Sequence, residues 1–364
     1  ELLLEACRNL YNQALDMRKT AYEQTGKTIN YNAQAAMLAP LRKESPFWAH
    51  LHIDILQDVL RRLDKAYKAF FSRVKNGAEP GYPRFKGKGR YRSVTFSHLA
   101  KTLIISTKGR LARIVVPKLG QVKIRLHRPL PDGVIKTLTI IRKASGWYAS
   151  LVIEVTDVPK TESLSFVGVD VGLESFLTTS DGEKVKNPRY FLATIHLLKH
   201  LQRRLSKRIK GSRRRAKMRE RIARLYERIV NQRRDFHYKT AHHLYSQYDT
   251  VVVEDLKIKN MIQNHHLAQS ISDAAWGNFV LALGSKAEHA GCHLLKVPPH
   301  GTSQKCSGCS ETVKKSLAVR IHRCESCGLI LGRDHNAAIN ILRAASALRG
   351  GALVVNSPET LSKE

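Results

Sequence analysis

The first part of the chain carries apolar residues at the spacing of an amphipathic helix. Within SPFWAHLHIDILQDVLRRLDKAYKAFFSRVKNG they recur every three or four positions. These positions are Ile53, Leu56, Leu60, Leu63, Tyr67 and Phe70. Asn76-Gly77 then provides a stop signal. We therefore expect residues 1–76 to form a helical subdomain.

A different pattern begins after this stop signal. Residues 77–93 are so rich in Gly, Pro, Lys, Arg and Tyr that we expect no regular structure there. Short β-like runs separated by turns come next, namely TLIIS, ARIVVP, QVKIRL, KTLTIIRK and WYASLVIEV. The pattern predicts a small, mostly antiparallel and barrel-like β-domain over residues 77–160.

A second strand-rich region starts near residue 161. LSFVGVDVG is an apolar strand, FLTTS is a second strand, and we expect the Ser-Asp-Gly turn at 180–182 to join them as a hairpin. A long basic stretch over 189–247 then shows helical spacing, interrupted by Gly-Ser at 211–212. This stretch is expected to fold as two antiparallel helices.

Strand, helix and strand patterns follow. DTVVVEDL is an apolar strand with two acids at its end, and HLLKVPPH is another strand. Between them, SDAAWGNFVLALGSKAEHAG predicts a helix with Ser272 as its N-cap. A hairpin followed by strand, helix and strand, with acids at strand ends, is the order of an RNase H-like α/β fold. We expect residues 161–304 to form the first part of such a domain.

The charge of the chain narrows its partners. It has 62 Lys and Arg residues against 30 Asp and Glu, a formal net charge of +32, and such an excess repels itself unless a polyanion neutralises it. Nucleic acid is the first candidate partner. A membrane role is disfavoured, because no run of about 18 apolar residues and no signal peptide is visible. We expect a cytoplasmic protein from which a piece preceding Glu1 was trimmed or left out.

Four of the 6 cysteines form two CxxC pairs separated by a 14-residue spacer. This spacing is close to the zinc-ribbon template, in which four thiolates coordinate a structural Zn²⁺ tetrahedrally. The four are Cys306, Cys309, Cys324 and Cys327. The alternative is four unrelated thiols, and we expect His322 to be a surface histidine and not a competing ligand. Cys7 and Cys292 lie in apolar surroundings and are expected to be buried.

Three acidic residues are candidates for metal-dependent cleavage of phosphodiesters. Asp170 ends an apolar strand between Gly168 and Gly172, which we expect to let a phosphate backbone approach. Glu254 ends the VVVE strand, and Asp334 starts the helix NAAINIL. Three converging carboxylates can hold two Mg²⁺ ions about 4 Å apart, which activate a water and stabilise the leaving oxygen.

Each of these acids also has a simpler interpretation. Asp170 alone is compatible with a turn residue. Glu254 competes with Asp255, since strand alternation places the two on opposite faces, and the pattern favours Glu254. Asp334 alone is compatible with an ordinary N-cap.

Two basic segments are candidate nucleic-acid contacts. The first interleaves aromatic and cationic side chains, which suits stacking on bases and gripping phosphates, although an ordinary basic loop is the alternative. Its members are Tyr82, Arg84, Phe85, Lys86, Lys88 and Arg90. The second is a one-sided positive run in the helical stretch, which we expect to bind a nucleic-acid backbone and not to be only a solvated face. Its members are Arg203, Arg204, Lys207, Arg208, Arg213, Arg214, Arg215 and Lys217.

Several motifs, taken together and in order, resemble one family. GVDVGLESFLTTSDG, VVVEDLKIKNM, PPHGTSQKCSGC and GRDHNAAINIL are similar to the TnpB family of transposon-encoded RNA-guided DNA nucleases, relatives of the type V CRISPR effectors. FKGKGRYRSVTF and NQRRDFHYKTAHHL also resemble this family. The resemblance implies a RuvC-like nuclease domain with Asp170, Glu254 and Asp334 as its acidic triad. It also implies a guide RNA and target DNA as partners.

The resemblance further implies how the chain is divided. The helical segment would be a recognition subdomain, and the β-rich segment a wedge domain. A zinc ribbon over 305–329 would be inserted before the last part of the nuclease domain over 330–345, and a tail would occupy 346–364. The position two residues before Asp334, where the family often has another acid, is Gly332. The family usually begins with a wedge-domain strand, which does not precede Glu1 in this sequence.

The motifs favour an RNA-guided DNA endonuclease over two other hypotheses. One is a guide-dependent DNA-binding protein that does not cleave, such as a repressor. Retention of all three acids argues against it. The other is a DNA strand-transfer transposase, whose chemistry such a triad would permit. Against this hypothesis, nothing in the sequence resembles an end-joining tyrosine or serine site.

Overall fold

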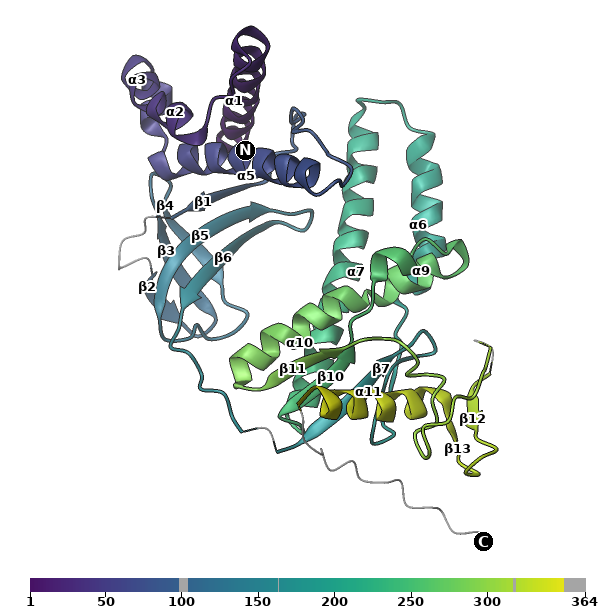
Figure 1. Cartoon of the computed structure of the whole chain (residues 1–364). Coiled ribbons are helices and arrows are strands. Elements are labelled where there is room, and N and C mark those ends of the chain that lie inside the picture. The colour runs from purple at the N-terminus through teal and green to yellow at the C-terminus, as the bar shows by residue number, and fades with distance from the viewer. Residues whose placement is uncertain (98–103, 163, 317–318, 350–364) are drawn as a thin grey trace. The chain divides into compact units, whose positions relative to one another are not determined.

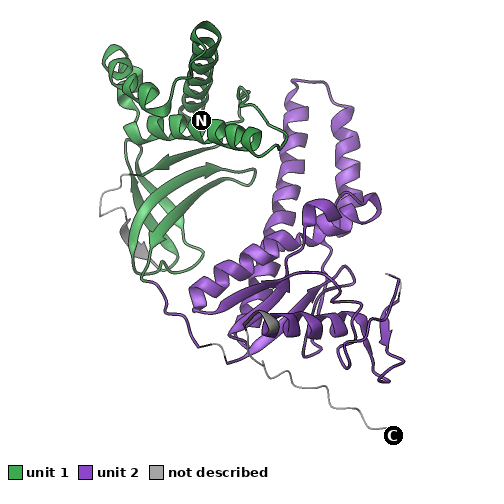
Figure 2. Ribbon diagram, in the orientation of Figure 1, with its two compact units in different colours: residues 1–156 green, residues 157–364 purple. Residues whose placement is uncertain are grey.

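The computed structural model of the chain describes residues 1–97, 104–162, 164–316 and 319–349. The chain divides into two compact units, residues 1–156 and residues 157–364 (Figure 2). No helix in the described part of the chain is long and apolar enough to cross a membrane.

The first unit begins with helices, as the apolar spacing predicts. They are α1 (Leu2–Thr25), α2 (Tyr31–Ala36), α3 (Leu38–Glu44), α4 (Pro46–His50) and α5 (Ile53–Lys75) (Figure 1). Helix α1 ends at Gly26, whose φ of 66° is the left-handed conformation that glycine adopts at little cost. Helix α2 starts at Asn30, whose side chain accepts a hydrogen bond from the Ala33 N–H.

Two antiparallel sheets follow in the same unit. One has the order β1-β5-β6, formed by β1 (Ser93–Phe96), β5 (Val134–Arg142) and β6 (Trp147–Glu154). The other has the order β2-β3-β4, formed by β2 (Ile104–Lys108), β3 (Leu111–Val116) and β4 (Gly120–Arg125). Antiparallel strands thus occur where the β-like runs predict them, in one compact unit with the preceding helices. Strand β1 was not expected, and residues 102–103 of the predicted TLIIS strand lie outside the described residues.

The helices and the strands of this unit share a hydrophobic core. Leu15 of α1 and Leu63 of α5 are fully buried in the same cluster as Phe96, Ile114 and Leu138 of the strands. Burying one such side chain contributes roughly 1.5–3 kcal/mol, so neither half is expected to keep its stability without the other.

The second unit contains a five-stranded sheet with the order β11-β10-β7-β8-β9. Its strands are β7 (Phe166–Val171), β8 (Ser175–Thr179), β9 (Lys184–Lys186), β10 (Thr250–Glu254) and β11 (His293–Val297). Strands β7, β8 and β9 pair antiparallel, whereas β10 pairs parallel with both β7 and β11.

The predicted hairpin turn was assigned to the wrong pair of strands. Strands β7 and β8 are joined by Gly172-Leu173-Glu174, and the Ser-Asp-Gly turn at 180–182 joins β8 to β9. Gly182 has a φ of 89°, which suits the tight turn that the sequence indicated. Residues 180–182 do form a turn, as predicted. The short strand after it, Lys184–Lys186, was not predicted, because it contains a single apolar residue.

The long basic stretch forms the predicted helical pair, α6 (Tyr190–Ser206) and α7 (Arg213–Tyr245). Gly211 has a φ of 86° between them, and the Ser212 side chain caps α7 by accepting from the Arg215 N–H. Three further helices, α8 (Ile258–Met261), α9 (His265–Ala274) and α10 (Trp276–Ala290), lie between β10 and β11 in the sequence.

The prediction of one helix capped by Ser272 is wrong. Ser272 lies inside α9. The helix is interrupted at Ala275, which adopts a left-handed φ of 53° and separates α9 from α10. Neighbouring hydrogen bonds compensate this strained conformation: buried Asp273 accepts from the backbone N–H groups that open α6, and His237 bonds the Ala274 carbonyl. These partners are distant in sequence, so the local pattern does not reveal the break.

Helices cover both faces of the five-stranded sheet (Figure 1). On one face, Val251 and Val253 of β10 pack with residues of α7, α9 and α10. On the other face, Val252 packs with Ile341, Leu342 and Ala345 of the last helix, α11 (Arg333–Arg349). The alternation along β10 therefore assigns each residue to one of the two helical layers.

A small two-stranded sheet, β12 (Ile321–Arg323) paired antiparallel with β13 (Ile330–Gly332), lies between β11 and α11 in the sequence. It carries the second cysteine pair between its strands. Helix α11 begins directly after β13 and continues past the expected end of the domain at residue 345, to Arg349. Residues 350–364 of the expected tail lie outside the described residues.

Candidate active site and metal centre

Asp170 lies near the end of β7 and on the face of the sheet that α11 covers. Val167 and Val169 belong to the core on the opposite face, so alternation places Gly168 and Asp170 toward α11. A Cβ atom at Gly168 would lie 2.1 Å from the Ala338 carbonyl oxygen. The expectation that Gly168 admits a phosphate backbone is therefore wrong, because α11 fills that space.

Glu254 ends β10 on the same face as Val252, and it is partly buried. The Thr302 hydroxyl donates a hydrogen bond of 2.5 Å to its Oε1. Burial raises the pKa of Glu254, and the Thr302 hydrogen bond opposes that shift. Asp255 instead pairs with Lys257 at 2.6 Å, which lowers its pKa. Glu254 is thus bonded to Thr302, whereas Asp255 forms an ion pair with Lys257. Strand alternation leads us to expect such different surroundings for the two acids.

Asp334 lies in the first turn of α11, where the helix dipole favours a negative charge. Arg333 Nε lies 3.4 Å from its Oδ1. A Cβ atom at Gly172, in the turn after β7, would lie 4.0 Å from its Oδ2. The third predicted acid therefore stands beside the strand end that carries Asp170.

The structure makes the three predicted acids electrostatic neighbours. The pKa of Asp170 is raised well above its usual range, first by burial and then by the charges of Glu254 and Asp334, while Arg333 lowers it. Such a cluster is unbalanced, because one nearby guanidinium faces three carboxyl groups. A bound cation would relieve this repulsion.

The four predicted cysteine ligands lie much closer together than the acids. Their Sγ atoms are all within 4.8 Å of one another, with Cys306 to Cys327 at 3.6 Å and Cys309 to Cys324 at 3.5 Å. A hydrogen bond from the Cys327 backbone lowers the pKa of the Cys324 thiol to about 6. Within the described residues, no other group of three or more His, Cys, Asp or Glu side chains is as compact as these cysteines, so the three acids are more widely spaced.

The remaining cysteines and His322 are buried. Cys7 and Cys292 are buried, as the sequence predicts, and Cys7 belongs to the hydrophobic core of the first unit. His322 is fully buried, so the expectation of a surface histidine is wrong. Its Nδ1 contacts the Lys315 ammonium, and burial followed by the Lys315 charge lowers its pKa. On β12, His322 is the buried residue between two exposed neighbours, which the sequence alone did not indicate.

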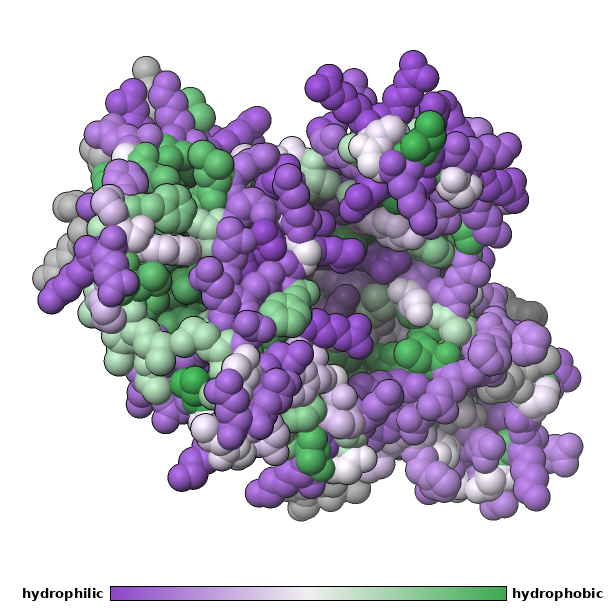
Figure 3. All heavy atoms as spheres, turned by 90° about the horizontal axis from the view of Figure 1, so that it is seen from above, coloured by the Kyte–Doolittle hydropathy of each residue, from purple (hydrophilic) through white to green (hydrophobic). Residues whose placement is uncertain are grey.

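The basic run lies on α6, α7 and the turn between them. Arg203, Arg204, Lys207, Arg213, Arg214 and Lys217 are exposed. Seen from above, the surface on the side of this helical pair is mainly hydrophilic (Figure 3). Arg215 differs from these exposed residues, because its Nη1 donates to the carbonyls of Leu205 and Arg208 at 2.8 and 2.7 Å. This guanidinium closes the end of α6 and is engaged within the helical pair.

The second basic segment is held against α1 and α5. Tyr82 and Tyr67 share a hydrogen bond of 2.9 Å, and the backbone of Lys86 bonds Asn12 in both directions. The Lys86 ammonium lies 4.6 Å from the centre of the Tyr11 ring, and burial lowers its pKa. The other charged members, Arg84, Lys88 and Arg90, are exposed, as are Tyr82 and Phe85.

Two residues near the acids were not expected from the sequence, Thr302 and Arg333. Neither a single threonine nor a single arginine forms a pattern that singles it out.

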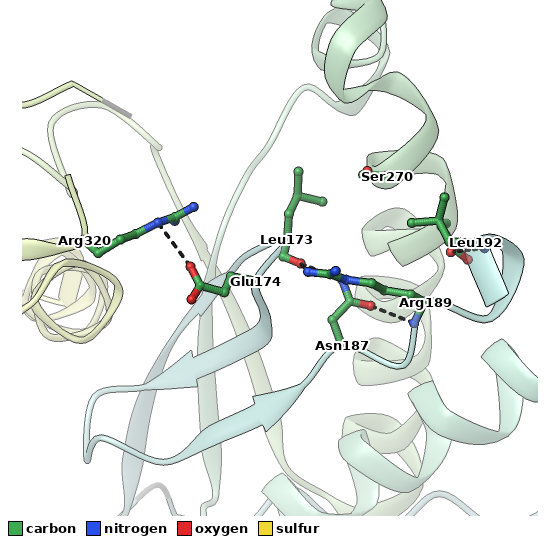
Figure 4. Close-up of a pocket in the computed structure, with 8 residues that line it drawn as sticks. Leu173, Glu174, Asn187, Arg189, Leu192, Ser270 and Arg320 are labelled. Carbon is green, nitrogen blue, oxygen red and sulfur yellow. Dashed lines mark hydrogen bonds and ion pairs between the residues drawn. The ribbon is translucent and has the colours of Figure 1, made fainter. Parts of the chain in front are cut away.

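A cavity of about 350 Å³ was also not expected, and it lies at the turn after β7 (Figure 4). There, Arg320 pairs with Glu174 at 3.1 Å, and Asn187 and Arg189 both donate to the Leu173 carbonyl. The cavity is lined by Leu173, Glu174, Asn187, Arg189, Leu192, Ser270, Asp273 and Arg320.

Comparison with known proteins places this chain among mobile-element and CRISPR-related proteins. Residues 150–265 match the family OrfB_IS605, described as a probable transposase, and residues 276–341 match the Cas12f1-like TNB domain. Two solved structures share the fold, the Cas12f1–sgRNA–target DNA complex (TM-score 0.55, 14% identity, 93% of this chain and 81% of that chain) and CRISPR-Cas_phi3 (TM-score 0.54, 9% identity, 95% and 90%). The fold is therefore the mixed α/β type of these effectors.

Two relatives match along nearly the whole chain. A putative RNA-guided DNA endonuclease of Streptomyces pristinaespiralis is 34% identical over 348 residues, covering 93% of this chain and 84% of that protein. The putative RNA-guided DNA endonuclease InsQ of Escherichia coli K12 is 31% identical over 378 residues, covering 99% and 91%. Matches to TnpB-like proteins of a mimivirus agree with both. This chain therefore belongs to the TnpB family of transposon-encoded RNA-guided DNA nucleases.

Proposed function

We propose that this nuclease cleaves target DNA at a RuvC-like site built from Asp170, Glu254 and Asp334, with Mg²⁺ as its catalytic ion. The observation that carries the proposal is the placement of the three acids, with Asp170 near the end of β7, Glu254 at the end of β10 and Asp334 in the first turn of α11. Burial and the other two acids raise the pKa of Asp170, which agrees with this placement. The sheet supports it as well. Its order has a central strand, β7, with an antiparallel pair on one side and two parallel strands on the other, as in RNase H-like folds.

The acid cluster fits a hard divalent cation. Carboxylate oxygens are the ligands that Mg²⁺ prefers, and the cluster is short of positive charge. When bound there, Mg²⁺ would supply a lowered pKa for an attacking water and charge stabilisation for the leaving oxygen. Asp170 is the central ligand in this proposal, since both other acids affect its pKa. Arg333 limits the repulsion between Asp170 and Asp334.

We propose structural Zn²⁺ at the four cysteines. Tetrahedral ligation at about 2.3 Å per Zn–S bond separates sulfur atoms by about 3.8 Å. The observed pairs at 3.5 and 3.6 Å and the upper limit of 4.8 Å fit this geometry. The four thiolates complete the coordination sphere and leave no position for a substrate, so the ion would stabilise the segment around β12 and β13.

Guide RNA and target DNA are the proposed partners. The exposed cations of α6 and α7 would bind nucleic-acid backbone without reading sequence. In the first unit, the helical segment 1–76 would serve recognition and the β-rich segment 77–160 would be the wedge domain. Exposed Tyr82 and Phe85 offer rings for stacking, whereas the packed Lys86 is the weakest candidate in that segment.

The test uses the chain purified with its co-purifying RNA and a DNA target that matches the guide. Asp170→Ala and Glu254→Ala should each lower the cleavage rate by on the order of 10³, because ligands of the ion serve the transition state. Asp255→Ala is the matched control, since Asp255 is adjacent but pairs with Lys257, and its rate should change less than about twofold. Guide-dependent binding should persist in all three.

The outcomes separate the alternatives. Normal cleavage by Asp170→Ala or Glu254→Ala in Mg²⁺ would overturn the proposed triad. A wild-type complex that binds its target and does not cleave would instead support the guide-dependent DNA-binding protein.

A further inference from the structure

The carboxylate of Glu254 is held by a loop that belongs neither to its own strand nor to the adjacent strands. Thr302 lies in the loop after β11, and its hydroxyl donates to Glu254 Oε1 at 2.5 Å. Only 8% of Thr302 is exposed. Among the described residues, Thr302 is the one hydrogen-bond donor to this carboxylate.

A tight turn fixes where Thr302 lies. Gly301 has a φ of 79°, and its carbonyl accepts the N–H groups of Gln304 and Lys305 at 3.1 and 2.9 Å. A residue with a side chain would be strained at this φ. The turn leads directly into Cys306, the first cysteine of the metal-type cluster.

Helix α11 clamps this turn through side-chain amides. Asn340 donates to the Thr302 carbonyl at 2.8 Å and to the Lys305 carbonyl at 2.7 Å. Asn336, four residues earlier on the same helical face, donates to the Lys305 carbonyl at 2.8 Å and accepts the Ser307 N–H at 2.9 Å. The helix that presents Asp334 at its start therefore also holds the loop that contacts Glu254.

We propose that Thr302 is a positioning residue for the acid cluster: it orients the Glu254 carboxylate for cation binding, and Asn340 of α11 keeps Thr302 in place. This inference rests on the proposed function of the three acids. Two of the acids then depend on α11, Asp334 because it is part of the helix and Glu254 through the Asn340–Thr302 contact. The loop also connects this contact to the cysteine cluster through the chain itself.

The experiment measures Mn²⁺ binding to the zinc-loaded full chain without RNA, by electron paramagnetic resonance of free Mn²⁺. Asp170→Ala defines the signal that belongs to the acid cluster. Thr302→Val removes the hydroxyl at nearly constant shape and should weaken Asp170-dependent binding about tenfold. Thr302→Ser keeps the hydroxyl and should bind within about twofold of the wild type. Zinc content and the thermal melting curve of each variant report whether the fold is retained.

Asn340→Ala provides a second, independent variant. It should weaken Mn²⁺ binding in the same direction, and adding it to Thr302→Val should weaken binding less than the product of the two single effects, because both changes remove one positioning contact. If Thr302→Val does not fold, Mn²⁺ binding by Asn340→Ala tests the proposal instead. In the guide complex, both variants should need more Mg²⁺ for half-maximal cleavage.

The proposal and the function on which it rests fail separately. If wild type and Asp170→Ala bind Mn²⁺ equally, the acid cluster is not the cation site. If binding depends on Asp170 but Thr302→Val and Asn340→Ala match the wild type, the positioning role of Thr302 is wrong and the triad is unaffected. Equal weakening by Thr302→Ser and Thr302→Val would also overturn it, since the hydroxyl would not be the active group.

Discussion

The two clusters of metal-type side chains in the second unit are built in different ways. The four cysteines come from one short stretch of chain and have their sulfur atoms within 4.8 Å of one another. The three acids come from β7, β10 and α11, which are far apart in sequence. The charges of Glu254 and Asp334 both raise the pKa of Asp170, but the three acids do not form so tight a group.

This difference shows which contacts each cluster needs. Local turns bring the cysteines of each pair together, and nearby backbone N–H groups bond to the sulfur atoms, as Gly308 does to the Cys306 Sγ. The acids require the close packing of α11 on β7, which Gly168 permits, and the hydrogen bond from Thr302. Zinc content should therefore be sensitive to local changes, and catalysis to changes in packing.

The largest expected effect is the loss of zinc in Cys324→Ser. Structural zinc sites contribute apparent free energies of about 10–16 kcal/mol, so replacing one ligand should remove most of the bound ion and unfold the segment around β12 and β13. Metal analysis should find about one Zn²⁺ per wild-type chain and almost none in the variant. Cys292→Ser is the control, because Cys292 is buried outside the cluster and should leave zinc content unchanged. A folded wild type without zinc would contradict the assignment.

Gly168→Ala should disrupt the acids and spare the cysteines. The added Cβ would lie 2.1 Å from the Ala338 carbonyl, so α11 must shift, at a cost of about 1–3 kcal/mol in unfolding free energy. Denaturant unfolding and cleavage rates should both decline, while zinc content stays the same.

Gly284→Ala is the matched control for this change. Gly284 lies inside helix α10, and an added Cβ would be at an ordinary contact distance of 3.8 Å from Leu294 of β11. In a helix, alanine is more stable than glycine by about 1 kcal/mol. Equal stability changes at both glycines would remove the argument that close packing of α11 builds the acid cluster.

Asp170→Asn should stabilise the fold in the absence of divalent cations. The pKa of Asp170 is raised in the folded state, so the folded chain binds more protons there than the unfolded chain, and stability falls as pH rises from about 4. The substitution should therefore raise the unfolding free energy by about 1 kcal/mol or more near neutral pH and have little effect well below pH 4. Thermal unfolding in EDTA across this pH range measures it. Added Mg²⁺ should stabilise the wild type more than the variant, and the reverse order would place the cation elsewhere.

The smallest expected effect concerns the exposed cations of the helical pair. Replacing Arg213, Arg214 and Lys217 with Gln should weaken binding to all sequences and flatten the log–log salt dependence by about 0.9 for each phosphate that the variant no longer neutralises. Arg215→Gln should instead lower the stability of the pair by about 1–2 kcal/mol, since Arg215 bonds two backbone carbonyls. Titrations at several salt concentrations separate the two. An unchanged slope in the triple variant would move the binding surface elsewhere.

Patterns over short stretches of sequence determined much of this protein. Apolar spacing predicted the helices before residue 76, the helical pair α6–α7 and the core strands β7, β10 and β11, because periodicity reflects which side of an element is buried. The CxxC spacing predicted the cysteine cluster, because four ligands so close in the chain can be gathered by local turns. Their places at strand ends and at a helix start singled out the three acids, the family motifs agreed, and alternation favoured Glu254 over Asp255.

Tertiary contacts decided the rest. The break at Ala275 depends on Asp273 and His237 bonding partners far along the chain. Gly168 serves the approach of α11, and Arg215 closes α6. Thr302 bonds Glu254 from a loop that α11 also contacts. Each of these outcomes is an interaction between residues distant in sequence, and no local pattern encodes which distant group will complete a hydrogen bond or fill a space.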